Sequence, residues 1–195
     1  MSGEERVTDT TSTHSSPLLH GAIAGDEIPA APWHLSGAAL GLLHFSLSQR
    51  QFGVLAMVHY NYSPVGPYNE LALAILTSRG PSVVQMPVTS QASMIGGRRI
   101  WGFPKKLAEL RCRCDGERMV FTAGKKQWRA RAIGPTFPLR LRASRTQQLQ
   151  GKWVRVPFQI TGRVRLAFCG RRLAVLMESF VMVVYPPLEL GKEAL

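Results

Sequence analysis

Two adjacent lysines, Lys105 and Lys106, are the residues whose type and placement best suit chemistry in this sequence. A lysine amine attacks a carbonyl carbon only when it is neutral, but an ordinary lysine has a pKa of about 10.4 and is protonated at neutral pH. An apolar surround and a second positive charge both lower the pKa of a lysine. The sequence supplies candidates for both influences, because Trp101 and Phe103 could wall the site and Lys106 could repel the charge of its neighbour. Lys105 is therefore a candidate nucleophile.

The other residue types that commonly do chemistry form no recognisable site. His34, His44 and His59 are isolated, and no histidine pair has the spacing of a metal site with a carboxylate. Cys112 and Cys114 lack the spacing of zinc ligands and are predicted to share one face of a strand. The sequence therefore predicts neither a metal site nor a cofactor.

The elements that must position Lys105 are predicted to be mostly strands. Alternating or continuous β-type segments recur along the chain, separated by turn residues. Strands are predicted over residues 51–60, 71–77, 82–89, 117–123, 127–133, 139–144, 153–160, 163–168 and 180–185. The two segments on either side of residues 124–126 are predicted to form a hairpin.

One or two short helices are predicted among these strands. Ser90 and its neighbours could cap a short helix over residues 92–95, which Gly96 and Gly97 would end or bend. A second short helix is predicted over residues 171–179. So many strands without a long exposed edge predict a mainly β (α+β) fold, with an antiparallel sheet closed or nearly closed on itself.

Length and composition fit a single domain behind an N-terminal tail. A chain of 195 residues, 45% of them hydrophobic, can bury a core of its own. Residues 1–17, rich in Ser, Thr and acidic residues, are predicted to be a disordered tail, and residues 18–195 a single domain. No apolar run approaches the roughly 20 residues of a membrane-spanning helix. The tail lacks the features of a secretory signal, and the three cysteines form no even set for disulfides, so a cytoplasmic location is expected.

The net charge of +12 raises the possibility of a polyanionic partner. The basic residues, however, mostly alternate with apolar ones, as in residues 139–142 and 154–156. This alternation is typical of the solvent side of a half-buried sheet. Nucleic acid is therefore not the expected partner.

A lysine pair alone is weak evidence for catalysis, because most such pairs lie in solvent, as we expect for the turn at Lys125 and Lys126. The residues around Lys105 strengthen the case. The run Gly97-Arg98-Arg99-Ile100-Trp101-Gly102-Phe103-Pro104-Lys105-Lys106-Leu107 resembles the signature of the acetoacetate decarboxylase family. Upstream, Gly66-Pro67-Tyr68-Asn69-Glu70 is similar to the Tyr-x-Glu element of that family.

The resemblance implies a role for each matching residue. Lys105 would form the Schiff base, Lys106 would be its electrostatic neighbour, and Glu70 would be the acid that moves protons or positions the substrate. Acetoacetate decarboxylase is itself a standard example of a lysine activated by a neighbouring cation. The resemblance also implies a sheet closed into a cone-like β-barrel, chemistry without a cofactor, and a homo-oligomer.

Two polar residues of the family pattern are missing here. The classical decarboxylases carry a second glutamate upstream of the Tyr-x-Glu element, and an ungapped count places Leu55 at that position. They also carry an arginine near the N-terminus, whereas this chain has none between Arg6 and Arg50. A substrate carboxylate still needs a partner, so Arg98 and Arg99 are candidate replacements.

The substrate-binding candidates are thus Arg98, Arg99, Tyr68, Trp101 and Phe103. The predicted function is a Schiff-base lyase that decarboxylates a small 3-oxo acid. Two alternatives on the same fold stay open: an aldolase or dehydratase that acts on a 2-oxo acid, and a non-catalytic small-molecule binding protein. A polyanion-binding module is the least favoured alternative.

Overall fold

Long alternating strands build nearly all of the part of the chain that the structure describes. This computed structural model describes residues 28–46, 48 and 50–190, so the predicted tail over residues 1–17 lies outside it. The elements, in chain order, are β1 (Trp33–Ser46), β2 (Gln51–Tyr62), β3 (Tyr68–Thr77), β4 (Gly80–Val88), α1 (Gln91–Trp101), β5 (Lys105–Leu107), β6 (Leu110–Cys114), β7 (Arg118–Ala123), β8 (Lys126–Leu149), β9 (Lys152–Cys169), β10 (Arg172–Val184) and β11 (Leu188–Glu189).

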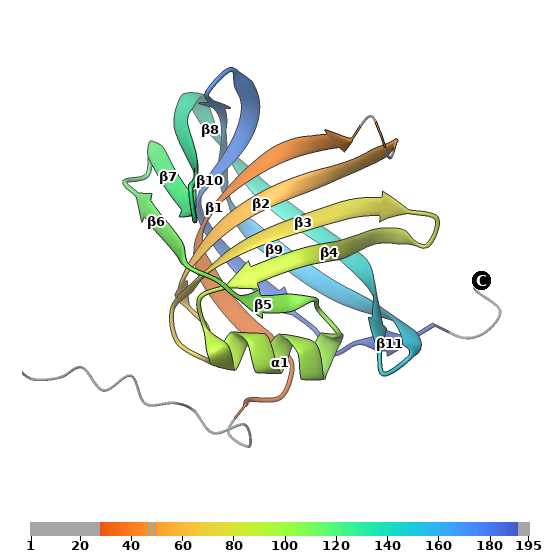
Figure 1. Ribbon diagram of the computed structural model, residues 1–195. Coiled ribbons are helices and arrows are strands. Elements are labelled where there is room, and N and C mark those ends of the chain that lie inside the picture. The colour runs from red at the N-terminus through yellow and green to blue at the C-terminus, as the bar shows by residue number, and fades with distance from the viewer. Residues whose placement is uncertain (1–27, 47, 49, 191–195) are drawn as a thin grey trace, which may run out of the picture.

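All of these strands belong to one curled sheet (Figure 1). Its order is β5-β4-β3-β2-β1-β10-β9-β8-β7-β6, with β11 paired to β9. Every pair is antiparallel except β4 with β5, which is parallel. The mainly β, α+β fold with a helix is therefore confirmed. No helix in the described part of the chain is long and apolar enough to span a membrane.

The backbone ladder does not return from β6 to β5, so closure into a cone-like β-barrel is not confirmed. Side chains instead connect β4 to β8 across the curl. The hydroxyl of Ser82 donates to the carbonyl of Thr146 at 2.6 Å, and the hydroxyl of Thr146 donates to the carbonyl of Arg79 at 2.8 Å. Strands β4 and β8 are thus held near each other without a continuous strand pairing.

The two faces of the sheet carry separate apolar cores. We call the face that carries Tyr60, Glu70 and Phe180 the inner face, and the opposite face the outer face. The inner core reaches α1 at one end of the molecule. On the outer face the β6–β7 hairpin is packed against β1, β2 and β10, with these side chains in contact: Met119, Phe121, Leu40, Leu42, Met57 and Leu176.

The helix differs from its prediction at its C-terminal end. Ser90 caps α1 as expected, since its hydroxyl accepts the amide hydrogen of Ser93 at 3.1 Å. Gly96 and Gly97 do not end the helix, which continues to Trp101 and stops at Gly102 in the left-handed conformation. The two glycines instead leave room for side chains that pack against the helix.

Two other expectations need correction. Residues 171–179 are not a helix: Arg171 lies in a turn, and residues 172–179 belong to strand β10. Here Ala174 and Leu176 are buried on one face while Val175 lies on the other, so apolar residues on both faces hide the strand period. Strand β1 was not predicted at all, for the same reason: apart from His34 and His44, its residues are apolar or small on both faces. The predicted hairpin is confirmed, with Ala123 opposite Lys126.

Candidate active site

The turn between α1 and β5 brings Lys105 against the helix. Gly102, with a φ of 70°, reverses the chain, and the amide of Phe103 donates to the carbonyl of Gly97 at 3.1 Å. A β-carbon at Gly97 would lie 2.6 Å from Cδ and 2.7 Å from Cε of Lys105. Only a glycine therefore leaves room for the Lys105 side chain along this face of α1.

The amine of Lys105 is buried among polar partners. The residue is 4% exposed, and its Nζ lies 2.9 Å from Oε2 of Glu70 and donates to the hydroxyl of Ser93 at 2.8 Å. Nζ also lies 5.1 Å from the centre of the Tyr68 ring, a distance at which an aromatic face attracts a cation. The Tyr-x-Glu element and the lysine motif are thus brought together, as the sequence predicts for Lys105, Glu70 and Tyr68.

The electrostatics of Lys105 differ from the sequence prediction. Burial lowers the pKa of Lys105, but the charge of Glu70 and the phenol of Tyr68 outweigh it, so the pKa lies above the ordinary value. The prediction of a lowered pKa was therefore wrong. Burial is the largest single influence, but the charge of Glu70, the phenol of Tyr68 and their hydrogen bonds together favour the charged amine more strongly.

Lys106 does not take part in this balance. Successive side chains of a strand point to opposite faces, so Lys106 projects away from Lys105 and is exposed. Its charge is not among the influences that shift the pKa of Lys105. The expected role of Lys106 as a repelling cation is therefore not supported by its position.

Glu70 links Lys105 to two tyrosines. The hydroxyl of Tyr60 donates to Oε1 of Glu70 at 3.1 Å, while Oε2 faces Lys105. The Tyr60 and Tyr68 rings lie 4.6 Å apart. Burial, together with the charge of Glu70, raises the pKa of Tyr60, and burial raises the pKa of Tyr68 to about 12. Both phenols are therefore neutral at physiological pH and can donate hydrogen bonds.

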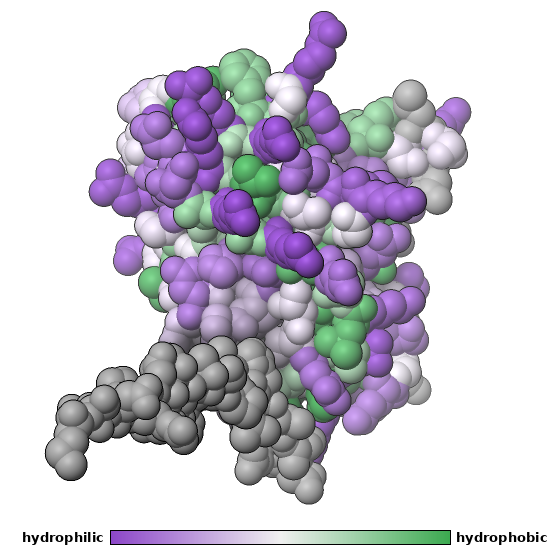
Figure 2. Space-filling model, turned by 60° about the vertical axis from the view of Figure 1, so that its left-hand side comes forward, coloured by the Kyte–Doolittle hydropathy of each residue, from purple (hydrophilic) through white to green (hydrophobic). Residues whose placement is uncertain are grey.

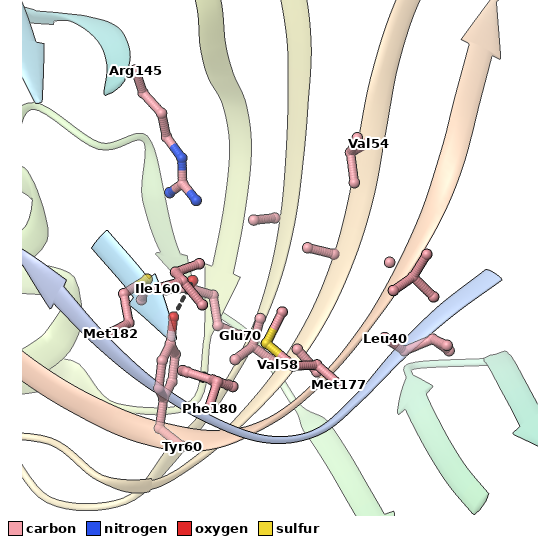
Figure 3. A pocket seen from close by; sticks show the side chains of 15 residues that line it. Leu40, Val54, Val58, Tyr60, Glu70, Arg145, Ile160, Met177, Phe180 and Met182 are labelled. Atoms are coloured by element: carbon pink, nitrogen blue, oxygen red, sulfur yellow. Dashed lines mark hydrogen bonds between the residues drawn. The ribbon is translucent and has the colours of Figure 1, made fainter. Parts of the chain in front are cut away.

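A pocket of about 200 Å³ opens on the inner face beside Glu70. Figure 3 shows its apolar wall, formed by side chains such as Val58, Met177 and Phe180, with Glu70 and Tyr60 joined at one end. Lys105 does not line this pocket. Its Nζ contacts the pocket wall at Glu70, so the carboxyl group of Glu70 stands at the boundary between the amine and the pocket.

Arg145 is the functional candidate that the sequence did not reveal. It projects from β8 into the pocket, toward the end that holds Glu70 (Figure 3). Its guanidinium lies 4.4 Å from the centre of the Phe158 ring. Burial lowers the pKa of Arg145, and the charges of Tyr60 and Glu70 partly offset that effect. Within the described part of the chain, no carboxylate lies within ion-pair distance of this guanidinium, so it is suited to bind an acid.

The other predicted substrate contacts lie away from this pocket. Arg98 is exposed on α1 and donates from Nε to the carbonyl of Lys105 at 2.6 Å, so it positions the backbone of the lysine. Arg99 lines a separate surface depression along the helix. Trp101 and Phe103 are buried in the inner core and do not line the Glu70 pocket, contrary to the expectation that they contact substrate. Trp101 instead donates from Nε1 to the carbonyl of Tyr185 at 2.8 Å.

The position counted as the missing glutamate does not face the pocket. Leu55 packs against the outer core, whereas its neighbours Val54 and Ala56 line the pocket on the inner face. Neither Val54 nor Ala56 is acidic, so no residue of β2 takes the place of the missing glutamate in the pocket lining. Among the described residues, Glu70 is the single carboxylate that lines this pocket.

A family model described as acetoacetate decarboxylase (ADC) matches residues 44–130. The matched segment contains both Glu70 and Lys105, the two residues whose ion pair forms the centre of the site. Residues 44–130 are thus similar to the acetoacetate decarboxylase family. No curated protein sequence matches it.

Solved structures of other proteins share this fold at low sequence identity. The acetoacetate decarboxylase of Legionella pneumophila is 12% identical, with a TM-score of 0.52 over 84% of this chain and 88% of that one. A second acetoacetate decarboxylase structure is 11% identical, with a TM-score of 0.52 over 84% and 91%. The enduracididine biosynthesis enzyme MppR, complexed with pyruvate, is 13% identical, with a TM-score of 0.52 over 96% and 100%. At such identities the likeness shows the fold alone.

Proposed function

We propose that this acetoacetate decarboxylase-like protein is a Schiff-base lyase that decarboxylates a 3-oxo acid through an iminium on Lys105. The observation that carries the proposal is the buried Lys105 amine, held 2.9 Å from a carboxylate that lines an apolar pocket. The similarity of residues 44–130 to the acetoacetate decarboxylase family supports the same reaction class.

The first step requires a neutral amine. Oε2 of Glu70 is close enough to accept a proton directly from Nζ of Lys105. A substrate carboxylate that binds in the pocket brings a second negative charge close to Glu70, which favours protonation of Glu70 by Lys105. Substrate binding would thereby convert the stable ion pair into a neutral pair with a nucleophilic amine.

The bond changes that follow depend on an iminium, a cationic group that accepts an electron pair from a neighbouring bond. The amine attacks the ketone carbon of the 3-oxo acid, and loss of water gives a cationic iminium. The bond to the carboxylate carbon breaks, carbon dioxide leaves, and its electron pair moves into an enamine. Protonation of the enamine carbon, for which Glu70 is the nearest acid, and hydrolysis of the iminium release a ketone and free Lys105.

Arg145 is the proposed partner of the substrate carboxylate. A guanidinium can bind both oxygens of a carboxylate in one plane. Because Arg145 projects toward Glu70, an acid bound to it would place its carbon chain in the apolar pocket. Arg145 would thus take the place expected for Arg98 or Arg99.

A 2-oxo acid is the second candidate substrate, since MppR, which shares the fold, is complexed with pyruvate. The same iminium would then serve aldol or dehydration chemistry. The homo-oligomer and the cytoplasmic location stay predictions.

Product analysis tests the reaction. Wild-type protein should release carbon dioxide and a ketone from acetoacetate or a longer 3-oxo acid, Lys105→Met should release none, and Lys106→Met should keep most of the activity. Aldol or dehydration products from pyruvate and an aldehyde, without carbon dioxide, would favour the second candidate. Reversible binding of both acids without any product would contradict both and indicate a binding protein.

A further inference from the structure

The pocket beside Glu70 continues into a second apolar pocket of about 220 Å³ on the same inner face. The two pockets share Gly41, Val54 and Val175. The second pocket is bounded by Leu43, Leu166 and Leu173, three leucines that are about half exposed or more. An apolar passage therefore leads from the polar end of the site to the surface.

The strand register gives the length of this passage. Glu70 lies opposite Val58, and Val58 lies opposite Ala39. Leu43, at the outer opening, lies opposite Val54. The passage therefore extends from Ala39 to Leu43, four residue steps along β1, which is roughly 13 Å at the usual rise of a strand. Acetoacetate, with a single methyl group beyond its ketone, would leave most of this length empty.

We infer that the substrate is an amphipathic oxo acid, whose carboxylate binds Arg145 and whose alkyl tail extends along this passage past Gly41. This inference rests on the proposed function for the identity of the reactive head group. Large aliphatic groups line the passage, whereas its polar groups are confined to the end that holds Arg145 and Glu70. The exposed leucines at the opening fit a tail that emerges toward solvent.

Gly41 is the point where the passage can be blocked. A β-carbon there would meet no atom closer than 3.9 Å, the carbonyl oxygen of Val175, so a side chain can be added without a backbone clash. A leucine at this position would occupy the space shared by the two pockets. Val181, exposed on the outer face of β10, provides a control position for a substitution by the same residue.

Binding of saturated fatty acids tests the inference without requiring any reaction. Calorimetry with butyrate, hexanoate, octanoate and decanoate should show affinity rising toward decanoate by up to about fourfold per methylene that leaves water. In Gly41→Leu the affinity should stop rising at the short acids, while Val181→Leu should keep the wild-type series.

An affinity of the wild-type protein that does not rise with fatty-acid length would overturn the inference, whether or not Gly41→Leu folds. If the opening instead binds a second copy of the chain, the series would be flat and Leu173→Glu would convert a dimer into a monomer. Turnover of acetoacetate with a flat series would reject the tail passage and leave the proposed function intact. An affinity that rises with chain length, without turnover of any oxo acid, would support the tail passage and reject the proposed function.

Discussion

At the residue scale, two opposing influences act on the amine of Lys105. Burial lowers its pKa, while the charge of Glu70 and the phenol of Tyr68 raise it and prevail. The raised pKa of Lys105 therefore depends on Glu70 and Tyr68 together, and Lys106, exposed on the opposite side of β5, is not among its causes.

Glu70→Gln should reverse the direction of this pKa shift. Without the carboxylate, burial becomes the dominant influence, so the pKa of Lys105 should fall below its ordinary value instead of lying above it. Titration of the Lys105 side chain by NMR measures this directly. Lys106→Gln is the matched control and should leave the titration unchanged; a shift in the control would restore the role first expected for Lys106.

The same substitution should reverse the pH dependence of stability. In the wild type the raised pKa means that the ion pair stabilises fully below about 10.4, and that this contribution is lost as the pH rises through the folded-state pKa. In Glu70→Gln a lowered pKa makes stability increase as the pH rises toward about 10.4. Urea unfolding of both proteins between neutral and alkaline pH compares the slopes, and parallel slopes would contradict the account.

Arg145→Met should weaken the binding of carboxylates about 10- to 100-fold, as expected when a charged hydrogen-bond partner is lost. The KM for an oxo acid, or the Kd for a fatty acid, measures this loss. Arg142→Met is the control, because Arg142 is exposed on the same strand and does not line the pocket. Equal effects of both substitutions would indicate a general loss of positive charge rather than a contact.

At the element scale, α1 and its two glycines hold the site together. Gly97 accommodates the side chain of Lys105, whereas a β-carbon at Gly96 would lie 2.6 Å from the Trp33 ring. Gly96 therefore leaves room for Trp33, and Gly97 leaves room for Lys105.

Gly97→Ala should displace Lys105 and reduce turnover at least tenfold, with a smaller loss of stability because the end of a flexible side chain can move. Gly96→Ala should mainly lower stability by about 1–3 kcal/mol, since the rigid Trp33 ring cannot move aside easily. Turnover and urea unfolding of both variants check the contrast. Equal losses of turnover would show that Gly97 has no separate role in placing the lysine.

The sequence predicts those parts of this site that lie close together along the chain. Lys105 and Glu70 could be identified because their motifs are local. Arg145 could not, because it follows the predicted strand over residues 139–144 and belongs to no motif, and only the curl of the sheet places it opposite Glu70. The period-two strands were likewise predictable, whereas β1 was not, because Leu40 and Leu42 pack outward while Ala39 and Gly41 line the pocket.

At the scale of the whole molecule, the curl of the sheet forms the pocket. Figure 2 shows polar side chains over much of one face of the molecule, interrupted by apolar patches. On the inner face, β1, β2, β3, β8, β9 and β10 all contribute to the pocket wall. The side-chain bonds between Thr146, Arg79 and Ser82 help to keep β8, and with it Arg145, close to β4.

Thr146→Val should therefore destabilise the protein by about 0.5–1.5 kcal/mol, the usual contribution of one hydrogen bond. It should also weaken carboxylate binding, because β8 carries Arg145. Thr122→Val is the control: its hydroxyl takes part in a 3.4 Å bond with Gln127 on an exposed strand, so little change is expected. Urea unfolding measures the first effect, and unchanged stability in Thr146→Val would show that this connection does not support the curl.

Reductive trapping is the most direct test of the central claim that Lys105 captures a ketone. The protein is incubated with a panel of oxo acids and borohydride, and the modified residue is located by mass spectrometry of its peptides. The account predicts a covalent adduct on Lys105, absent from Lys105→Met and retained in Lys106→Met. Contradictory results would be no adduct with any oxo acid, or an adduct spread over the exposed lysines while Lys105 stays unmodified.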